Sequence, residues 1–384
     1  ESNFTGGANR SLMIVIERLK KMYNVEVEVL LPNKEGEFNT KLDELGIKWY
    51  YFFPYFGVIS SIRNDGKDFL RVLKVYVGYV IEHFLGIFVA HKLKNEKYDL
   101  VYTNTRLPIV GAKIAKKLRI PHICHVREFG AEKPLWGFWR YKDMYKMSDK
   151  IICISNALSD KFKEYVPEDK IVTIHNGIDS PLNLKCDFEK KNKDTFDLIL
   201  TGRIVPDKGQ AEAIEAIRIL KSKGYNNIIL HIVGSSPQRM YIGWYDEQIK
   251  KMVKQYKLED NVVFHGEIHN MVKIRGKMNV ELMCAIRETF GRVTVEGMRS
   301  GLLVIRSNTG GTLEIINDGV NGLLYEQGNY KDLATKIEKV YKDNNLYQKI
   351  CKNGYNFSQN HFTPDENVKK IYAVMKEVCK GDDL

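Results

Sequence analysis

The chain alternates between short apolar runs and longer amphipathic stretches. Continuous apolar runs predict strands that are buried on both faces of a sheet. In the first half of the chain these runs span residues 25–31, 100–103, 122–125 and 150–154. In the second half they span residues 197–201, 228–233, 262–264, 280–285, 302–306 and 322–325.

Between these runs, apolar residues recur at the spacing of an amphipathic helix. Strands that alternate with helices predict an α/β fold with a parallel sheet covered on both faces. Residues 1–7 have the character of a loop that follows a strand, so we expect a first strand to be missing ahead of them. The helical stretches are 12–22, 208–223, 243–256, 292–300, 333–340 and 368–378.

The alternation occurs twice, which predicts two domains of similar architecture. A chain of 384 residues is long enough for two, because single cores stop growing at about 250–300 residues. Residues 185–196 are polar and charged and predict the linker. We therefore place the first domain at residues 1–184 and the second at 197–360.

Composition and net charge limit the classes of molecule that the protein could bind. The chain is 44% hydrophobic and 28% charged, as expected of a folded soluble protein, and its net charge of +11 favours an anionic partner. Zinc-finger spacing, an aromatic RNA-binding strand and an arginine tract are all absent from the sequence, which argues against nucleic acid. Anionic lipid, a pyrophosphate-linked acceptor or simply a solvated basic surface fit the charge equally well.

The cysteines and the length of the longest apolar run bear on where in the cell the protein works. The six cysteines are scattered and form no C-x-x-C pair, which is typical of a reducing cytoplasm. No signal-peptide pattern is visible at the start of the sequence. The longest apolar run, residues 75–90, has 16 residues and includes Glu82 and His83. A membrane span needs about 20 apolar residues, so we do not expect this run to cross a bilayer.

Two glutamates are the most informative chemistry in the sequence. Glu288 follows an apolar strand, Gly291 forms a turn, and Glu296 lies in the helix that the turn opens. Ligands bind at the carboxyl ends of parallel strands, and a helix N-terminus favours phosphate there. This arrangement suits a nucleotide sugar. One acid would lie near the sugar, the helix amides would bind the diphosphate, and the second acid would accept hydrogen bonds from the ribose hydroxyls. The alternative for Glu296 is a surface ion pair with Arg292.

Arg203 and Lys208 lie just after the first strand of the second domain, in a loop that begins at Gly202 and ends at Gly209. Departure of a nucleoside diphosphate concentrates negative charge on its oxygens. Fixed cations therefore stabilise the transition state more than the ground state. Arginine binds two phosphate oxygens together, whereas lysine acts as a point charge. Alone, the two residues would be ordinary exposed cations; beside the two glutamates we expect them to be functional.

Five segments, taken together, resemble the family 4 retaining glycosyltransferases of the GT-B fold. Residues 288–296 match the E-x7-E signature and residues 202–209 the G-R-x4-K-G loop. Residues 175–179 resemble the N-G-I-D segment, residues 310–315 the G-G-x-x-E-I run, and Gly6 and Gly7 the first glycine loop. The segments occur in the family's order across nearly the whole chain.

The resemblance implies a fold and a reaction. The fold would be α/β GT-B, with two Rossmann-like domains whose parallel sheets face each other across a cleft. Residues 361–384 would form a helix that crosses back to the first domain. The reaction would move a sugar, with retention, from a nucleotide diphosphate donor based on uridine to a saccharide or lipid-linked saccharide acceptor. It would serve polysaccharide or glycoconjugate biosynthesis in the cytoplasm.

The resemblance also assigns roles to residues. Glu296 would accept both ribose hydroxyls, and Glu288 would contact the donor sugar. From the first domain, either His125 or Arg127, two residues apart, would contact that sugar. Arg203 and Lys208 would hold the diphosphate, and we expect no cofactor and no metal because these cations and helix amides replace one. The remaining predicted binding residues are Gly6, Gly7, Arg127, Gly202, Gly234, Gly266, Glu267, Ile268, Phe290, Gly291, Arg292 and Val293.

The first domain also has a candidate acceptor surface. An aromatic run at residues 49–56 precedes a basic stretch that contains Arg63, Lys67, Arg71 and Lys74. Cations attract anionic lipid and aromatic side chains suit head-group depth, so these residues predict peripheral membrane contact. The alternative is an ordinary core strand followed by a core helix.

Three other functions remain open on the sequence. A GT-B nucleotide-sugar epimerase would share the fold, but that group lacks the E-x7-E spacing. An inactive nucleotide-sugar-binding subunit would not need both acids and both cations. A nucleic-acid-binding protein would be supported by charge alone.

Overall fold

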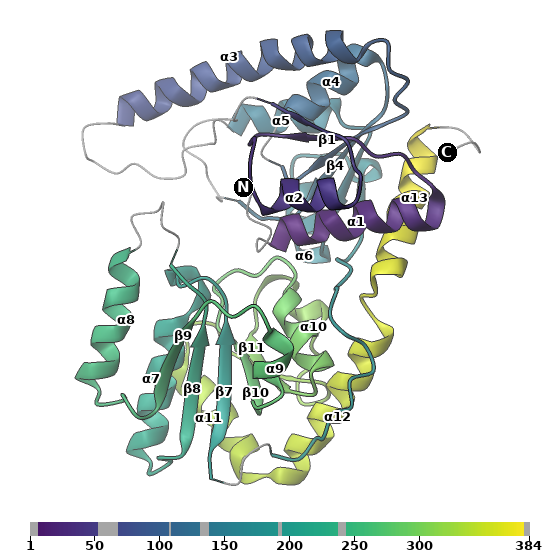
Figure 1. Ribbon diagram of the computed structural model, residues 1–384. Helices are drawn as coiled ribbons and strands as arrows, with labels where there is room; N and C mark the ends of the chain where they lie inside the picture. The colour runs from purple at the N-terminus through teal and green to yellow at the C-terminus, as the bar shows by residue number, and fades with distance from the viewer. Residues whose placement is uncertain are drawn as a thin grey trace. The chain divides into compact units, whose positions relative to one another are not determined.

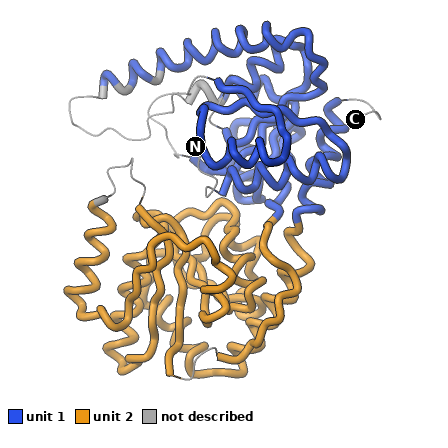
Figure 2. Tube along the Cα trace, in the orientation of Figure 1, with its two compact units in different colours: residues 1–177, 364–384 blue, residues 178–363 orange. Residues whose placement is uncertain are grey.

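A computed structural model of the protein describes residues 7–52, 68–106, 109–130, 138–190, 194–236 and 243–379. The chain forms two compact units (Figure 2). The first contains residues 1–177 and 364–384, and the second contains residues 178–363. The predicted linker, residues 185–196, therefore belongs to the second unit. There the Tyr355 hydroxyl donates a hydrogen bond to the Leu184 carbonyl, and the Lys190 ammonium donates to the Tyr341 carbonyl.

The first unit is built on a parallel four-stranded sheet in the order β3-β4-β5-β6. Its strands are β3 (Val101–Asn104), β4 (His122–Val126), β5 (Lys150–Cys153) and β6 (Ile171–Thr173). A separate parallel pair consists of β1 (Val29–Leu31) and β2 (Trp49–Tyr51). The helices are α1 (Gly7–Tyr23), α2 (Glu37–Glu44), α3 (Asp68–Leu93), α4 (Val110–Leu118), α5 (Phe138–Met147), α6 (Asn156–Lys163) and α13 (Pro364–Cys379).

The last helix of the chain packs in the first unit, beside its first helix (Figure 1). Apolar residues of α1 and α13 form one buried cluster with Ile123 and Ile152 of the sheet. The rings of Tyr23 and Tyr372 stack, with centroids 3.8 Å apart. Burial of these side chains holds the two distant segments together, at about 25 cal/mol per Å² of apolar surface removed from water.

The second unit is a parallel six-stranded sheet in the order β12-β11-β10-β7-β8-β9. Its strands are β7 (Phe196–Thr201), β8 (Ile228–Val233), β9 (Val262–Gly266), β10 (Val280–Met283), β11 (Leu303–Ser307) and β12 (Leu323–Tyr325). Its helices are α7 (Gln210–Ser222), α8 (Gly243–Gln255), α9 (Met271–Arg275), α10 (Arg292–Arg299), α11 (Tyr330–Lys342) and α12 (Asn344–Asn360).

Arg299 of α10 joins the two ends of the second unit. Its guanidinium is fully buried and donates to the carbonyls of Ile178, where the unit begins, and of Ser358 and His361 near its end. Because several carbonyls share one buried cation, both ends of the unit are fixed to the helix that also bears Glu296.

The apolar segment of the first unit is longer than the sequence indicated. Residues 75–90 lie within α3, which extends over 26 residues. The stretch Val72–Leu93 is long and apolar enough to cross a membrane by length and composition, and 18% of it is buried inside the structure. The expectation that this apolar segment is shorter than a membrane span is therefore wrong.

Candidate functional site

The strand order of the second unit reverses at one place. From β7 the chain adds β8 and β9 on one side, then crosses to add β10, β11 and β12 on the other (Figure 1). The loops after β7 and β10 leave the sheet in opposite directions, and ligands of open α/β sheets bind at such a point. The predicted residues Arg203 and Lys208 follow β7, and Glu288 follows β10.

The loop after β7 is pressed against the loop after β10. Gly209 has φ +72°, and a side chain there would place its Cβ 2.1 Å from the carbonyl oxygen of Cys284. Only glycine fits this conformation and this distance. The close approach brings the Lys208 ammonium to 3.0 Å from a carboxylate oxygen of Glu288. Arg203 is exposed and forms no ion pair with the residues that the structure describes.

Glu288 is held as a carboxylate. Burial raises its pKa, but the charges of Lys208 and Arg306 and hydrogen bonds from Lys208 and the Phe290 backbone outweigh burial, so the pKa is lowered. An ionised acid beside a lysine can accept hydroxyl hydrogen bonds while the lysine faces phosphate oxygens.

Glycines at the carboxyl ends of β7, β8 and β9 extend the same edge of the sheet. The Gly202 amide donates to the Val233 carbonyl, and the Gly234 amide donates to the Gly266 carbonyl, at 2.9 and 2.8 Å. Glu267 accepts a hydrogen bond from Ser235 at 2.5 Å, whereas Ile268 packs into an apolar cluster with Val233. The backbone of these residues, more than their side chains, therefore shapes this end of the site.

The turn before α10 is also built around glycine. Gly291 has φ +101°, and a Cβ there would lie 2.1 Å from a guanidinium nitrogen of Arg306. Phe290 is buried, with its ring 5.2 Å from that of Phe362. The side chain of Phe290 therefore fixes the turn. Arg292 and Val293 begin the helix, so the helix N-terminus lies beside Glu288.

Glu296 forms a buried ion-pair network that the sequence did not predict. Arg275 of α9 donates to Glu296 at 3.1 Å and to Glu281 of β10 at 2.8 Å. The ion pair between Glu296 and Arg292, which was the alternative for Glu296, is also present at 3.9 Å, but both side chains are largely buried and do not form a surface pair. Burial opposes charge on Arg275, but the two carboxylates outweigh it and raise the pKa of Arg275. The network holds the Glu296 carboxylate in one orientation.

Arg306 of β11 also lies beside the candidate site, and the sequence did not predict it. It is fully buried beneath the Gly291 turn and donates to Thr294 through one nitrogen. Its Nε and other terminal nitrogen have no hydrogen-bond partner in the described residues. Burial lowers the pKa of Arg306 to about 10, although Glu288 and Tyr325 favour its charge. A cation so buried places positive potential behind the turn where the diphosphate is predicted to bind.

Both missed arginines leave a signal in the sequence. Glu281 interrupts a buried apolar strand, and a buried carboxylate needs a cationic partner. Arg306 ends an apolar run in the same way. Neither signal identifies its partner, because that depends on which segments the fold brings together.

The predicted residues of the first unit have different surroundings. His125 of β4 is fully buried and contacts Tyr102 and Arg127. Burial, with the charge of Arg127, lowers the pKa of His125 well below its usual value, so its ring is neutral, and its Nε2 has no partner in the described part of the chain. Arg127 donates to Asn104 and Asn176 at 2.5 and 2.6 Å.

Parts of the predicted binding surfaces lie outside the described residues. Gly7 is the exposed first residue of α1, and Gly6 lies before the described chain. Of the candidate acceptor surface, residues 53–67 are outside it. Groups of three or more histidine, cysteine or acidic residues that could bind a metal are absent from the described residues.

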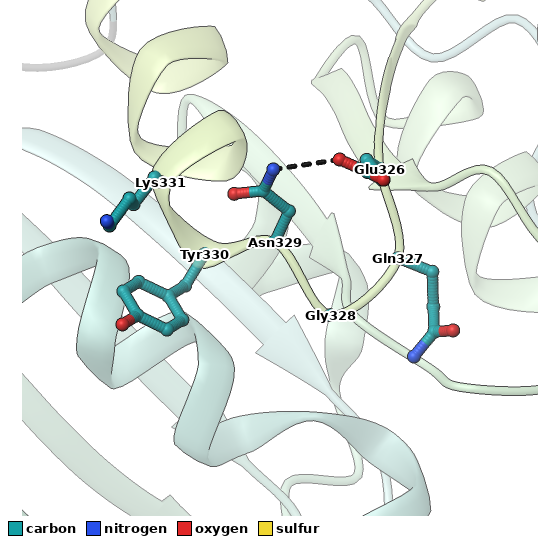
Figure 3. A pocket seen from close by; sticks show the side chains of 6 residues that line it. All are labelled: Glu326, Gln327, Gly328, Asn329, Tyr330 and Lys331. Atoms are coloured by element: carbon teal, nitrogen blue, oxygen red, sulfur yellow. Dashed lines mark hydrogen bonds between the residues drawn. The ribbon is translucent and has the colours of Figure 1, made fainter.

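One hollow lies at the turn between β12 and α11 (Figure 3). Residues 326–331 line it, and its volume is about 470 Å³. Asn329 donates to Glu326 at 2.8 Å and accepts from the Asp332 amide at the start of α11. These side chains serve the helix cap, and none of the predicted site residues lines this hollow.

Comparison with known proteins identifies the family. Residues 5–180 match the family described as Glycosyltransferase Family 4, and residues 185–357 match Glycosyl transferases group 1. The chain belongs to glycosyltransferase family 4. It is therefore a glycosyltransferase, and the predicted α/β GT-B fold with two Rossmann-like domains and parallel sheets is confirmed.

The relatives and structural neighbours named here are distant in sequence. The capsular polysaccharide biosynthesis glycosyltransferase CapM of Staphylococcus aureus is 29% identical over 60% of this chain and 63% of CapM. An Escherichia coli enzyme, UDP-Gal:alpha-D-GlcNAc-diphosphoundecaprenol alpha-1,3-galactosyltransferase, is 23% identical over 96% of both chains. The crystal structure of Anabaena HepE with UDP has a TM-score of 0.78 and 21% identity, covering 97% of this chain and 96% of HepE.

Proposed function

We propose that this family member is a retaining glycosyltransferase that uses a UDP-sugar. Its acceptor would be a saccharide or lipid-linked saccharide in polysaccharide or glycoconjugate biosynthesis. The observation that carries the proposal is the Lys208–Glu288 pair at the point where the strand order reverses. HepE, which shares the fold, binds UDP, and the Escherichia coli relative uses UDP-galactose and a diphosphoundecaprenol-linked acceptor.

In this proposal the cations act on the leaving group. Arg203 and Lys208 contact the diphosphate oxygens, and Arg306 adds positive potential from behind the Gly291 turn. Backbone amides of Phe290 to Val293 complete the phosphate site. Their effect grows as the bond from the anomeric carbon to the phosphate oxygen breaks, because negative charge then accumulates on that oxygen. These groups take the place of a metal ion.

The acids hold the two sugars of the donor. Glu296 accepts the ribose hydroxyls, and the buried Arg275 fixes its carboxylate for that purpose. Glu288 accepts hydroxyls of the transferred sugar. Glycines lie at the carboxyl ends of β7, β8 and β9. Because Gly202, Gly234 and Gly266 have no side chains, the nucleotide base can approach the backbone closely there.

The reaction we propose is a front-face displacement. The acceptor oxygen attacks the anomeric carbon from the side that the diphosphate leaves, and the departing phosphate oxygen takes the acceptor's proton. Retention follows because attack and departure share one face.

We assign His125 and Arg127 to the donor sugar on the resemblance, supported by the unpartnered buried Nε2 of His125. Gly6 and Gly7 would approach the phosphates.

We further propose that the enzyme works in the cytoplasm, at the surface of a membrane that holds a lipid-linked acceptor. The net charge of +11 supports attraction to anionic lipid. An epimerase or an inactive subunit would not form a glycosidic bond, and the assay below separates them from a transferase.

The test has two steps. Thermal shift against UDP-, GDP- and ADP-sugars would identify the donor, with UDP-sugars expected to stabilise the protein. Transfer from that donor to a panel of saccharide and lipid-linked acceptors would follow, with the anomeric configuration of the product determined by NMR. An inverted product would overturn retention. Normal transfer by Glu296→Ala or Lys208→Ala would overturn the site.

A further inference from the structure

Helix α3 exposes an apolar face between Phe69 and Phe88 among its described side chains. Of the 18 large hydrophobic residues that are exposed in the described chain, nine lie on this helix. Phe69, Leu73, Tyr76, Val80, Phe84 and Phe88 recur every three or four residues, so they share one face. Phe69 is 76% exposed, Phe84 66% and Phe88 54%. A soluble protein rarely leaves so continuous an apolar face in water.

The orientation of α3 is fixed by its opposite face. Gly78, Glu82, Gly86 and Ala90, spaced four residues apart, are buried. At Gly86 the helix lies against α4, because a Cβ there would come 2.9 Å from the Cβ of Lys113. Small residues permit this close packing. A helix turned over would bury bulky phenylalanines there, so the apolar face cannot turn inward.

The charges around α3 identify what covers its apolar face. Between Phe69 and Leu93 the only acidic residue is Glu82, and it is 1% exposed. Lys74 and Lys92 are exposed on the helix, and Lys116 and Lys117 are exposed on α4. An apolar face with exposed cations, and with buried Glu82 as the one acidic residue between Phe69 and Leu93, matches an anionic bilayer, where apolar side chains enter and cations stay at the head groups. A second copy of this cationic face would be repelled.

We propose that α3 is the membrane-docking surface of this enzyme and lies in the plane of an anionic bilayer, attached to α4. The proposal rests on the proposed lipid-linked acceptor, because docking would place the first unit where such an acceptor emerges from the bilayer. Since one face of α3 is packed on the protein, the helix lies on the membrane and does not span it.

The test is flotation of the full chain with vesicles of phosphatidylcholine, with or without phosphatidylglycerol. The wild type should float with the anionic vesicles. The double variant Phe84→Glu/Phe88→Glu should lower the bound fraction by about tenfold or more, because two charges would have to enter the apolar boundary. Trp244→Glu, at a residue 58% exposed in the second unit, is the matched control and should bind like wild type.

Two further readouts separate this proposal from the proposed function. UDP-sugar binding and transfer to a water-soluble acceptor should be unchanged in the double variant, while transfer to an acceptor embedded in vesicles should fall. A Phe84→Trp variant should show a blue shift in fluorescence on adding anionic vesicles. Absence of binding by the wild type, equal binding by the double variant, or a dimer that the double variant abolishes would each overturn the docking surface, whatever the donor assay shows.

Discussion

The ammonium of Lys208 lies 3.0 Å from the carboxylate of Glu288, although 80 residues separate them in the sequence. Each residue follows a strand beside the point where the strand order reverses. The pairing keeps Glu288 ionised, since the nearby cations lower its pKa against the effect of burial. It also holds a cation next to the expected leaving group.

Lys208→Met should lower kcat by about 100-fold or more, because the charge that develops on the departing phosphate loses a fixed partner. The KM for the donor should change less, since ground-state binding uses more of the site. Steady-state kinetics with the identified UDP-sugar measure both. Lys251→Met, at an exposed lysine of α8, is the control. Equal rates for Lys208→Met and the control would remove Lys208 from the catalytic step.

Arg275→Met should destabilise the protein by about 3–5 kcal/mol, because Glu281 and Glu296 would lose a buried partner. Urea unfolding followed by circular dichroism measures this change. Lys250→Met removes a surface pair of similar length and should have little effect.

A double variant tests whether Arg275 positions Glu296. Arg275→Met/Glu281→Leu replaces the fully buried pair by apolar side chains and should recover much of the stability. The KM for the donor should be raised in both the single and the double variant, because Glu296 would lack its closest cation in each. If KM returned to the wild-type value together with stability, the role of Arg275 would be structural only.

Much of the second unit could be predicted from its apolar runs. The strand at residues 228–233 has the predicted bounds, and the loop, turn and helix around Glu288 and Glu296 follow the predicted order. Strands buried on both faces are apolar throughout, so pattern and structure agree there. The motif residues around β7 and β10 were found because their spacing is local.

What the sequence did not predict depends on tertiary packing. Helix α12 is rich in asparagine and contains Gly354, which disfavour helix, but it buries Tyr347 and Ile350 against the core. The extent of α3 was underestimated because Arg71 and Lys74 interrupt the apolar run. Arg275 and Arg306 were missed because their importance depends on which carboxylates and turns the fold brings beside them, and the local signals at Glu281 and Arg306 do not identify those partners.

Arg306→Met should fold with unchanged or higher stability, because burial lowers the pKa of Arg306 to about 10 and two of its nitrogens have no partner in the described structure. Replacing such a cation by an apolar side chain of similar volume relieves its desolvation cost. Activity should fall, since positive potential behind the diphosphate is lost. Thermal unfolding and kcat, measured together, test this trade-off. A large loss of stability would show that Arg306 is needed mainly for folding.

His122 should make the first unit sensitive to acid. It is fully buried between Thr103 and Ser148, and burial lowers its pKa to about 3. In the unfolded chain its pKa is about 6.5, so as pH falls the unfolded state takes up the proton first. The stability that depends on neutral His122 is complete above pH 6.5. It is lost as pH falls toward 3, by up to about 1.4 kcal/mol per pH unit.

The measurement is urea unfolding between pH 7.5 and 4.5 in a Trp244→Phe background, which leaves the other three tryptophans, all within residues 1–177, to report on the first unit. His122→Gln should be less stable than its parent at pH 7.5 but should lose less stability on acidification, because glutamine does not titrate. His91→Gln, at an exposed histidine of α3, should keep the parental slope. If His122→Gln and its parent lost stability in parallel, another buried group would control the acid response, and His122 would be excluded.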